Sequence, residues 1–248
     1  MKMTGHTILI TGGTSGIGLG LAERFHAEGN TVIIAGRREE LLRSITAEHP
    51  GMGSVVLDVR DPDSIRRCVA TVTAAHPDLD VLINNAGIML PEDLTDPAHL
   101  SIAEATVATN LLGPMRLLAE MVTFFVARPA AVIMNVSSGL AFVPLPLTPT
   151  YCATKAAIHS YTVSLRVQLR GTEVQVLELI PPAVQTDLMG MAEKGQGMPL
   201  PAFLSEVMDI LRTRPDAVEI CVDDVRFLRN AEAEGRQADV LAALSGAH

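Results

Sequence analysis

The sequence predicts a doubly wound α/β fold, and three observations support this prediction. Short aliphatic runs alternate with longer segments of helical periodicity along the chain. The runs are apolar throughout, as expected for parallel strands that are covered on both faces of a sheet. The chain has 248 residues, 48% of them hydrophobic, which is enough for one well-buried core. We therefore expect a single domain, 1–248, with a central parallel sheet of about seven strands and helices on both faces.

The order of the elements follows from these runs and periodic segments. The expected strands lie at 7–11, 31–35, 54–57, 81–83, 131–136, 174–180 and 217–222. The expected helices lie at 16–28, 38–48, 62–75, 100–126, 150–170, 201–213 and 223–232, followed by a polar tail. A short substrate loop is expected at about 188–200, where the Gly-, Pro- and Met-rich stretch is either a mobile lid or an ordinary loop.

Composition limits the function and the location of the protein. The net charge of −9 disfavours nucleic-acid binding, and no apolar stretch reaches the ~20 residues that a membrane span needs. Residues 1–6 precede the first strand without an apolar signal region, so we expect a cytoplasmic protein. Cys68, Cys152 and Cys221 are far apart, and no His or Cys spacing indicates a metal site. We interpret the cysteines as small buried side chains.

A glycine-rich turn lies between the first expected strand and the first expected helix. Residues 11–18 read TGGTSGIG. Glycines permit a tight turn with positive φ and let a ligand approach the backbone closely. The helix that follows directs free N–H groups and a positive dipole end toward the turn, which suits a pyrophosphate. The position of the turn makes a nucleotide site a stronger interpretation than an ordinary loop.

Tyr151 and Lys155 lie four residues apart, on one face of an expected helix. The chain has two tyrosines and three lysines, and random placement would give this spacing with a probability of roughly 2–3%. A phenol has an ordinary pKa near ~10, and a neighbouring ammonium stabilises the phenolate. Tyr151 is therefore a candidate acid/base for an alcohol or a carbonyl group, although an ordinary helix pair would share the spacing.

Together these motifs resemble the short-chain dehydrogenase/reductase (SDR) family, in its single-domain Rossmann form of about 250 residues. The resemblance rests on T-G-x-x-x-G-x-G at 11–18, N-N-A-G at 84–87 and Y-x-x-x-K at 151–155. The sequence PPAVQT at 181–186 resembles the family's P-G-x-V-x-T, with Pro182 in place of glycine. This segment and the helical C-terminus are similar to the DltE-like branch of the family, which takes its name from a D-alanine-esterification gene cluster.

The resemblance implies two further catalytic residues. Ser138 precedes Tyr151 by thirteen residues, the family's spacing for the serine that binds the substrate oxygen, and Ser137 is the alternative with a more structural role. Asn110 resembles the family's asparagine, which interrupts a helix and holds a water that continues a proton relay from the lysine. An ordinary polar kink is the other interpretation of Asn110.

The residues after the second expected strand indicate the cofactor. NAD-binding enzymes place an acidic residue there for the ribose 2′-hydroxyl, whereas an arginine accommodates the 2′-phosphate of NADP. Here Gly36 is followed by Arg37 and Arg38, so we expect NADP(H), with NAD(H) as the alternative. A structural role at the helix start is disfavoured, because arginine there opposes the dipole. Together with the arginines, the family resemblance implies the cofactor-binding residues Gly12, Thr14, Ser15, Gly16, Ile17, Gly18, Arg37, Arg38, Asp58, Val59, Asn85, Ala86, Gly87, Lys155, Pro181, Val184 and Thr186.

The function expected from this set is NADP(H)-dependent hydride transfer between nicotinamide and a ketone, an aldehyde or a secondary alcohol. The alternatives are a cofactor-binding sensor or scaffold without turnover, and an epimerase or dehydratase. The apolar sequence LAFVPLPL at 140–147 favours an apolar small-molecule substrate. The resemblance implies a homodimer or homotetramer that pairs the helices at 100–126 and 150–170.

Overall fold

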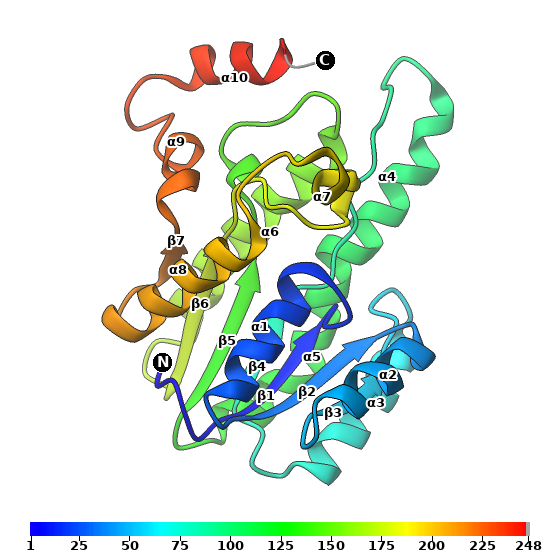
Figure 1. Ribbon diagram of the computed structural model, residues 1–248, viewed down its shortest axis with the longest axis vertical. Helices are drawn as coiled ribbons and strands as arrows, with labels where there is room; N and C mark the ends of the chain where they lie inside the picture. The colour runs from blue at the N-terminus through cyan, green and yellow to red at the C-terminus, as the bar shows by residue number, and fades with distance from the viewer. Residues whose placement is uncertain (247–248) are drawn as a thin grey trace.

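The computed structural model describes residues 1–246 and confirms the expected fold. Within these residues, seven parallel strands form one sheet in the order β3-β2-β1-β4-β5-β6-β7 (Figure 1). The strands are β1 Thr7–Thr11, β2 Thr31–Gly36, β3 Gly53–Val56, β4 Val81–Asn84, β5 Ala131–Val136, β6 Val174–Ile180 and β7 Glu219–Cys221. All seven expected strands are therefore present, and β2, β3, β4 and β7 differ from their expected bounds by one or two residues.

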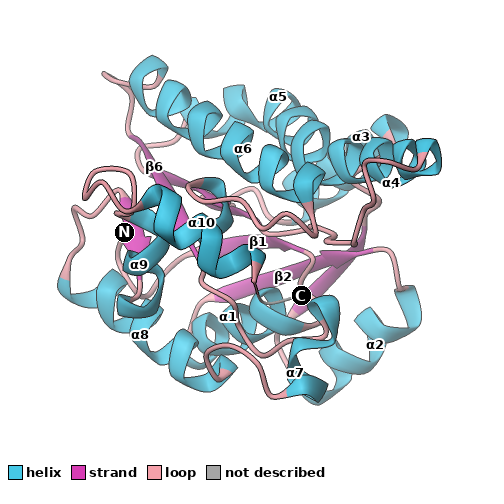
Figure 2. Ribbon diagram, turned by 90° about the horizontal axis from the view of Figure 1, so that it is seen from above, coloured by secondary structure: helices cyan, strands magenta, loops and turns pink. Residues whose placement is uncertain are grey.

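Two layers of helices enclose the sheet (Figure 2). The helices are α1 Gly16–Ala27, α2 Glu39–Glu48, α3 Pro62–Ala75, α4 Leu100–Val107, α5 Gly113–Val126, α6 Pro149–Gln168, α7 Met191–Lys194, α8 Leu200–Thr213, α9 Arg226–Arg229 and α10 Gln237–Ser245. One layer contains α1, α2 and α8, and the other contains α3, α4, α5 and α6. The remaining helices α7, α9 and α10 lie toward the end of the sheet where the strands finish (Figure 1).

Alternating side chains of each strand build two separate apolar cores. Ile8 and Ile10 of β1 pack in one core with Phe25 of α1. Leu9, which lies between them, packs in the other core with Phe125 of α5. Burial of each such side chain contributes about 1.5–3 kcal/mol to the free energy of unfolding. This two-sided burial is the reason that the strand sequences are apolar at consecutive positions.

The switch point of the sheet lies between β1 and β4. The chain proceeds from β1 outward to β2 and β3, and then returns to place β4 on the other side of β1. Loops after neighbouring strands consequently leave in opposite directions and open a crevice, which is where ligands bind in sheets of this type. Thr11 and Asn84 end the two strands at this crevice.

The helical segment expected at 100–126 is interrupted near Asn110, where the family resemblance implied an interruption. A π-helical turn at Ala108–Leu112 separates α4 from α5 and contains Asn110. A π-helical turn accommodates an additional residue, and such turns are common at functional sites. The sequence periodicity of the flanking helices does not reveal this insertion.

The C-terminal segment also differs from the expectation. The helix expected at 223–232 is limited to a 3₁₀ turn at Asp223–Val225 and the short α9. The expected polar tail contains α10, whose Val240 is buried with Val143 and Ala231 in a small apolar cluster. This long-range contact stabilises a helix that the local sequence did not indicate.

Two further sequence expectations concern the membrane and the cysteines. Among residues 1–246, no helix combines the length and the apolar character needed to cross a bilayer. Cys68 and Cys152 are buried and Cys221 is half-buried. Burial raises the pKa of the Cys68 thiol to about 12, which makes it a poor nucleophile.

Candidate active site

The glycine turn after β1 is held in place by the loop after β4. Gly12 has a φ of +67°, and a Cβ added to Gly18 would lie 2.3 Å from the carbonyl oxygen of Gly12. The Asn85 side chain donates from Nδ2 to the carbonyl oxygens of Thr11 and Gly12 at 3.0 and 3.2 Å. The Thr11 hydroxyl in turn accepts from the backbone N–H groups of Asn85 and Ala86. The two sequence motifs therefore form one rigid unit.

This unit borders a cavity of about 420 Å³, which we call the glycine-loop cleft. Of the expected cofactor-binding residues, the cleft is lined by Gly12, Thr14, Ser15, Gly16, Ile17, Arg37, Arg38, Asp58, Val59, Asn85, Ala86, Gly87 and Thr186. Gly18 packs behind the turn. The glycines leave the space that a pyrophosphate needs at the N-terminus of α1, so the residues fit a dinucleotide.

Three arginines line the glycine-loop cleft. Arg38 donates from Nη2 to the Thr14 hydroxyl at 2.8 Å, so its guanidinium lies beside the glycine turn. Arg60, which the sequence analysis did not single out, lines the cleft with Arg37 and Arg38. Arg60 contacts the Asp58 carboxylate from Nε at 3.0 Å and from Nη2 at 2.7 Å, and this pairing holds the pKa of Asp58 below its usual range. The only sequence signal for Arg60 was its position two residues after Asp58.

A second cavity, of about 610 Å³, adjoins the cleft, and we call it the tyrosine pocket. The two cavities share the lining residues Ile17, Asn85, Gly87, Thr186 and Leu188. The pocket brings together Ser138, Tyr151 and Lys155 from different parts of the chain. Pro181, Pro182 and Val184 also line it, so the expected nicotinamide-binding segment lies here, next to the catalytic candidates.

Burial determines the acid–base properties of Tyr151 and Lys155. Burial raises the pKa of Tyr151 to about 12, and a hydrogen bond with Ser138 opposes this effect. Burial lowers the pKa of Lys155 to about 8, and the negative charge of Glu178 opposes it. The Lys155 Nζ lies 5.5 Å from the centroid of the Tyr151 ring and donates to the Val136 carbonyl at 2.8 Å. A charged Lys155 at this distance favours loss of the tyrosine proton.

Asn110 lies behind the pocket and links three segments. Its Oδ1 accepts from the backbone N–H of Ile88 and its Nδ2 donates to the carbonyl of Ile88, both at 2.8 Å. Nδ2 also lies 3.4 Å from the Thr154 hydroxyl of α6. Asn110 therefore ties the π-helical turn to the chain after β4 and to the helix that carries Tyr151. The water relay implied by the family resemblance remains a prediction.

Two buried acidic residues support the site and were not found from the sequence. Glu92, which is 9% exposed, accepts from the backbone N–H of Thr150 at 3.0 Å and from the Thr150 hydroxyl at 2.7 Å. It therefore caps the first turn of α6, next to Tyr151. Glu178 of β6 is fully buried and accepts from the Ser137 hydroxyl at 2.5 Å. Ser137 is thus a structural partner of Glu178, as expected for the alternative to Ser138.

The segment at 188–200 forms one wall of the tyrosine pocket. It contains α7 and returns to the chain after β6 through a bridge between Val184 and Met198. Hydrogen bonds of 2.8 Å from the Met198 N–H to the Ala183 carbonyl and of 2.9 Å from the Gln185 N–H to the Met198 carbonyl fix this return. The side chains from this segment that line the pocket are Leu188, Met189, Met191, Lys194 and Gln196.

Comparison with known proteins agrees with this geometry. Residues 6–197 match the model of the short chain dehydrogenase family. A protein from Bacillus subtilis named "Uncharacterized oxidoreductase DltE" is 41% identical over 207 residues, which cover 83% of this chain and 82% of that protein. Serine 3-dehydrogenase from Rhizobium radiobacter is 34% identical over 185 residues, which cover 73% of each chain. The solved closed form of serine dehydrogenase complexed with NADP⁺ is 28% identical, with a TM-score of 0.77, and the match covers 86% of this chain and 92% of that one.

The chain therefore belongs to the short-chain dehydrogenase family of oxidoreductases, which use nicotinamide cofactors on small-molecule substrates. Within the family it belongs to the DltE-like branch. The expected catalytic tyrosine, lysine and serine lie in one pocket beside the glycine-loop cleft.

Proposed function

We propose that the protein transfers hydride between NADP(H) and a ketone, an aldehyde or a secondary alcohol, with Tyr151 as the acid/base. One observation carries the proposal. Ser138, Tyr151 and Lys155 line a pocket that shares a wall with the glycine-loop cleft. Pro181 and Val184 of the expected nicotinamide-binding segment line the same pocket, so a carbonyl carbon bound there would lie next to the nicotinamide.

The side chains have complementary roles in this reaction. The bound nicotinamide supplies the hydride. Tyr151 donates a proton to the carbonyl oxygen during reduction and accepts one from the alcohol during oxidation. Ser138 donates a hydrogen bond to the same oxygen as negative charge develops on it. Burial raises the pKa of Tyr151 to about 12, and a charged Lys155 beside the ring favours the phenolate against this effect of burial.

The charge of the glycine-loop cleft supports NADP(H) over NAD(H). Gly36 stands where an acidic residue would bind a free ribose 2′-hydroxyl, and Arg37, Arg38 and Arg60 line the same cleft as Gly36. A guanidinium binds phosphate through paired hydrogen bonds. The solved relative named above was complexed with NADP⁺, which agrees with this choice.

The walls of the tyrosine pocket favour an apolar substrate. Large apolar side chains from five segments line it, namely Met89, Leu140, Leu145, Leu147, Met189, Met191, Leu228 and Leu244. Burying a polar substrate against such walls would leave its hydrogen-bonding groups without partners, at a cost of about 1–3 kcal/mol for each group. We infer an aliphatic or aromatic carbonyl compound, used in the cytoplasm by a homodimer or homotetramer.

A substrate screen with the wild-type protein and the variant Tyr151→Phe tests the proposal. Ketones and aldehydes of increasing apolar size are offered with NADPH, and with NADH for comparison. We expect turnover with NADPH that falls by about 10²–10⁴-fold in Tyr151→Phe, since the phenol is the proton donor. Equal turnover by both proteins would exclude this mechanism. NADPH binding in calorimetry without turnover on any compound would instead indicate a cofactor-binding sensor or scaffold.

A further inference from the structure

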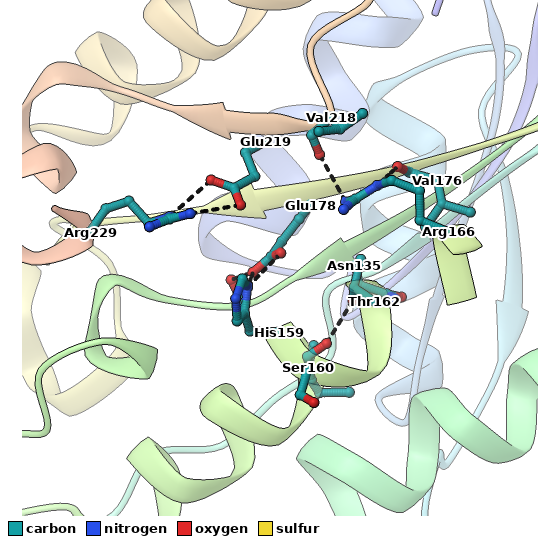
Figure 3. A network of polar contacts seen from close by, with 12 residues as sticks. Asn135, His159, Ser160, Thr162, Arg166, Val176, Glu178, Val218, Glu219 and Arg229 are labelled. Atoms are coloured by element: carbon teal, nitrogen blue, oxygen red, sulfur yellow. Dashed lines mark hydrogen bonds and ion pairs between the residues drawn. The ribbon is translucent and has the colours of Figure 1, made fainter. Parts of the chain in front are cut away.

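A buried carboxylate lies directly behind the catalytic residues. Glu178 is the third residue before Pro181, in β6, and its side chain is fully buried. One of its oxygens accepts from the Ser137 hydroxyl at 2.5 Å. His159 Nδ1 lies 3.0 and 2.9 Å from the two oxygens, as Figure 3 shows for His159 and Glu178. A carboxylate removed from water is costly unless it has such partners. The packing of a buried strand does not require a carboxylate, so the position of Glu178 behind the site indicates a functional role.

The two partners of Glu178 belong to the two elements that carry the active site. Ser137 lies between Val136, whose carbonyl accepts from Lys155, and Ser138, which contacts Tyr151. His159 follows Lys155 by four residues, as Lys155 follows Tyr151, so the three side chains share one face of α6. Glu178 therefore links the end of β5 to α6 at the level of the catalytic lysine.

The surroundings of His159 keep this link in place. Phe142 packs against the His159 ring with centroids 4.8 Å apart, and the Arg229 guanidinium lies 4.5 Å from the centroid of Phe142 (Figure 3 shows Arg229 and His159). Arg229 also binds Glu219 of β7 at 2.9 and 3.0 Å. A ring nitrogen of His159 and one carboxylate oxygen each of Glu178 and Glu219 lie within 4.8 Å of one another. Arg229 supplies the positive charge that two carboxylates so close together require.

Glu178 also acts on the charge of Lys155. Burial is the larger influence and disfavours the ammonium, whereas the negative charge of Glu178 favours it. The other titratable groups around Glu178 and Lys155 are Tyr151 and His159 on α6, and the Glu219–Arg229 pair and Cys221 on the side of β7. In this arrangement Glu178 is the countercharge that a buried lysine needs in order to stay protonated near neutral pH.

We propose that Glu178 is a positioning residue for the reaction: through Ser137 it fixes the strand end that presents the Val136 carbonyl and Ser138, and it is the countercharge of Lys155. This inference rests on the proposed function, because it assigns a role in the same proton transfer.

The variant Glu178→Gln tests the proposal, because it keeps the shape of the side chain and removes its charge. Lys155 should then lose its proton at lower pH. A neutral lysine leaves Tyr151 a weaker acid, so proton donation slows once Lys155 is deprotonated. The fall of kcat for carbonyl reduction at high pH, its alkaline limb, therefore follows the Lys155 charge and should move down by about one pH unit. An unmoved limb, in a variant with the circular dichroism and melting temperature of the wild type, would overturn the countercharge role. A wild type without turnover on any carbonyl would contradict the proposed function rather than this inference.

Two further variants separate charge from positioning. Ser137→Ala keeps the Glu178 charge and removes its link to β5, so kcat should fall by about 10-fold while the alkaline limb stays in place. Wild-type kcat in Ser137→Ala would overturn the positioning role.

Glu219→Gln is the matched control, because it removes a neighbouring carboxylate that makes no hydrogen bond with Ser137 or His159. The alkaline limb of this variant should not move. If Glu178→Gln does not fold, Glu178→Asp replaces it in the test. The shorter aspartate keeps the charge but withdraws from Ser137, so kcat should fall while the alkaline limb stays in place. A wild-type kcat in Glu178→Asp would overturn the proposal.

Discussion

The ammonium of Lys155 donates a 2.8 Å hydrogen bond to the backbone carbonyl of Val136 and thereby joins α6 to the end of β5. Both elements carry catalytic candidates, Tyr151 on the helix and Ser138 after the strand. The bond sets the distance between them, and it also holds a charged group where water is excluded. The proposed reaction needs the positive charge of Lys155, whereas burying that charge lowers the stability of the folded protein.

The variant Lys155→Met should show this conflict as a function of pH. Burial lowers the pKa of Lys155 from 10.5 to about 8. The buried charge therefore lowers the free energy of unfolding by its full amount below pH 8, and this loss of stability disappears as the pH rises toward 10.5. The wild type should therefore gain roughly 2–3 kcal/mol of unfolding free energy relative to Lys155→Met between pH 7 and pH 10.

Urea unfolding at a series of pH values measures this difference. The lost hydrogen bond to Val136 affects Lys155→Met equally at each pH, so the change with pH reports the lysine charge. Lys194→Met is the control, because Lys194 is exposed and should show no such trend. A constant difference between the wild type and Lys155→Met across this range would contradict the prediction.

Removal of the cleft arginines should reduce the selectivity for NADPH. In the double variant Arg37→Ala/Arg38→Ala, kcat/KM with NADPH should fall by about 10²–10⁴-fold, because charge-assisted hydrogen bonds of about 1.5–3 kcal/mol each are lost. The value with NADH should change little, since NADH has no 2′-phosphate. Steady-state kinetics with both cofactors provide the measurement. Arg43→Ala, on the exposed side of α2, is the matched control, and an equal loss with both cofactors would argue against phosphate binding.

Loss of the Glu92 charge should weaken the start of the catalytic helix. In Glu92→Gln the free energy of unfolding should fall by about 1 kcal/mol, because a carboxylate accepts from Thr150 beside the positive end of the α6 dipole. Tyr151 follows Thr150 directly, so kcat should fall as well. Thermal unfolding and turnover test both effects. Glu104→Gln in the exposed part of α4 should leave both unchanged, and a Glu92→Gln protein as stable as the wild type would refute the capping role.

Exposed apolar side chains on α6 should contribute to self-association. Val163 and Val167 are 40% and 48% exposed on this helix, and Val126 of α5 is 41% exposed. The double variant Val163→Glu/Val167→Glu should lower the mass measured by light scattering to that of a monomer, because charges would be buried in the interface. Val218→Glu, which alters an exposed valine near β7, should leave the mass unchanged. A wild-type protein that is already monomeric at micromolar concentration would rule out the predicted oligomer.

The order of strands and helices could be predicted from the sequence because it depends on local patterns. Side chains such as Ile8, Leu9 and Ile10 are buried on alternating faces, so an unbroken apolar run identifies a covered parallel strand. The glycine turn and the spacing of Tyr151 and Lys155 are local as well, since turn conformation and helical period are properties of neighbouring residues. The sequence by itself therefore determined the fold class, the glycine turn and the catalytic pair.

Only the tertiary structure decided which distant residues support that pair. Glu92 reaches α6 from 58 positions away and Glu178 reaches Ser137 across 41 positions, and neither belongs to a local motif. The helix α10 forms because Val240 packs against Val143, a contact that no periodicity encodes. Burial also sets the pKa values of Tyr151 and Lys155. Solvent exclusion and long-range contacts arise only when the chain is folded, and these are the properties that tune the site.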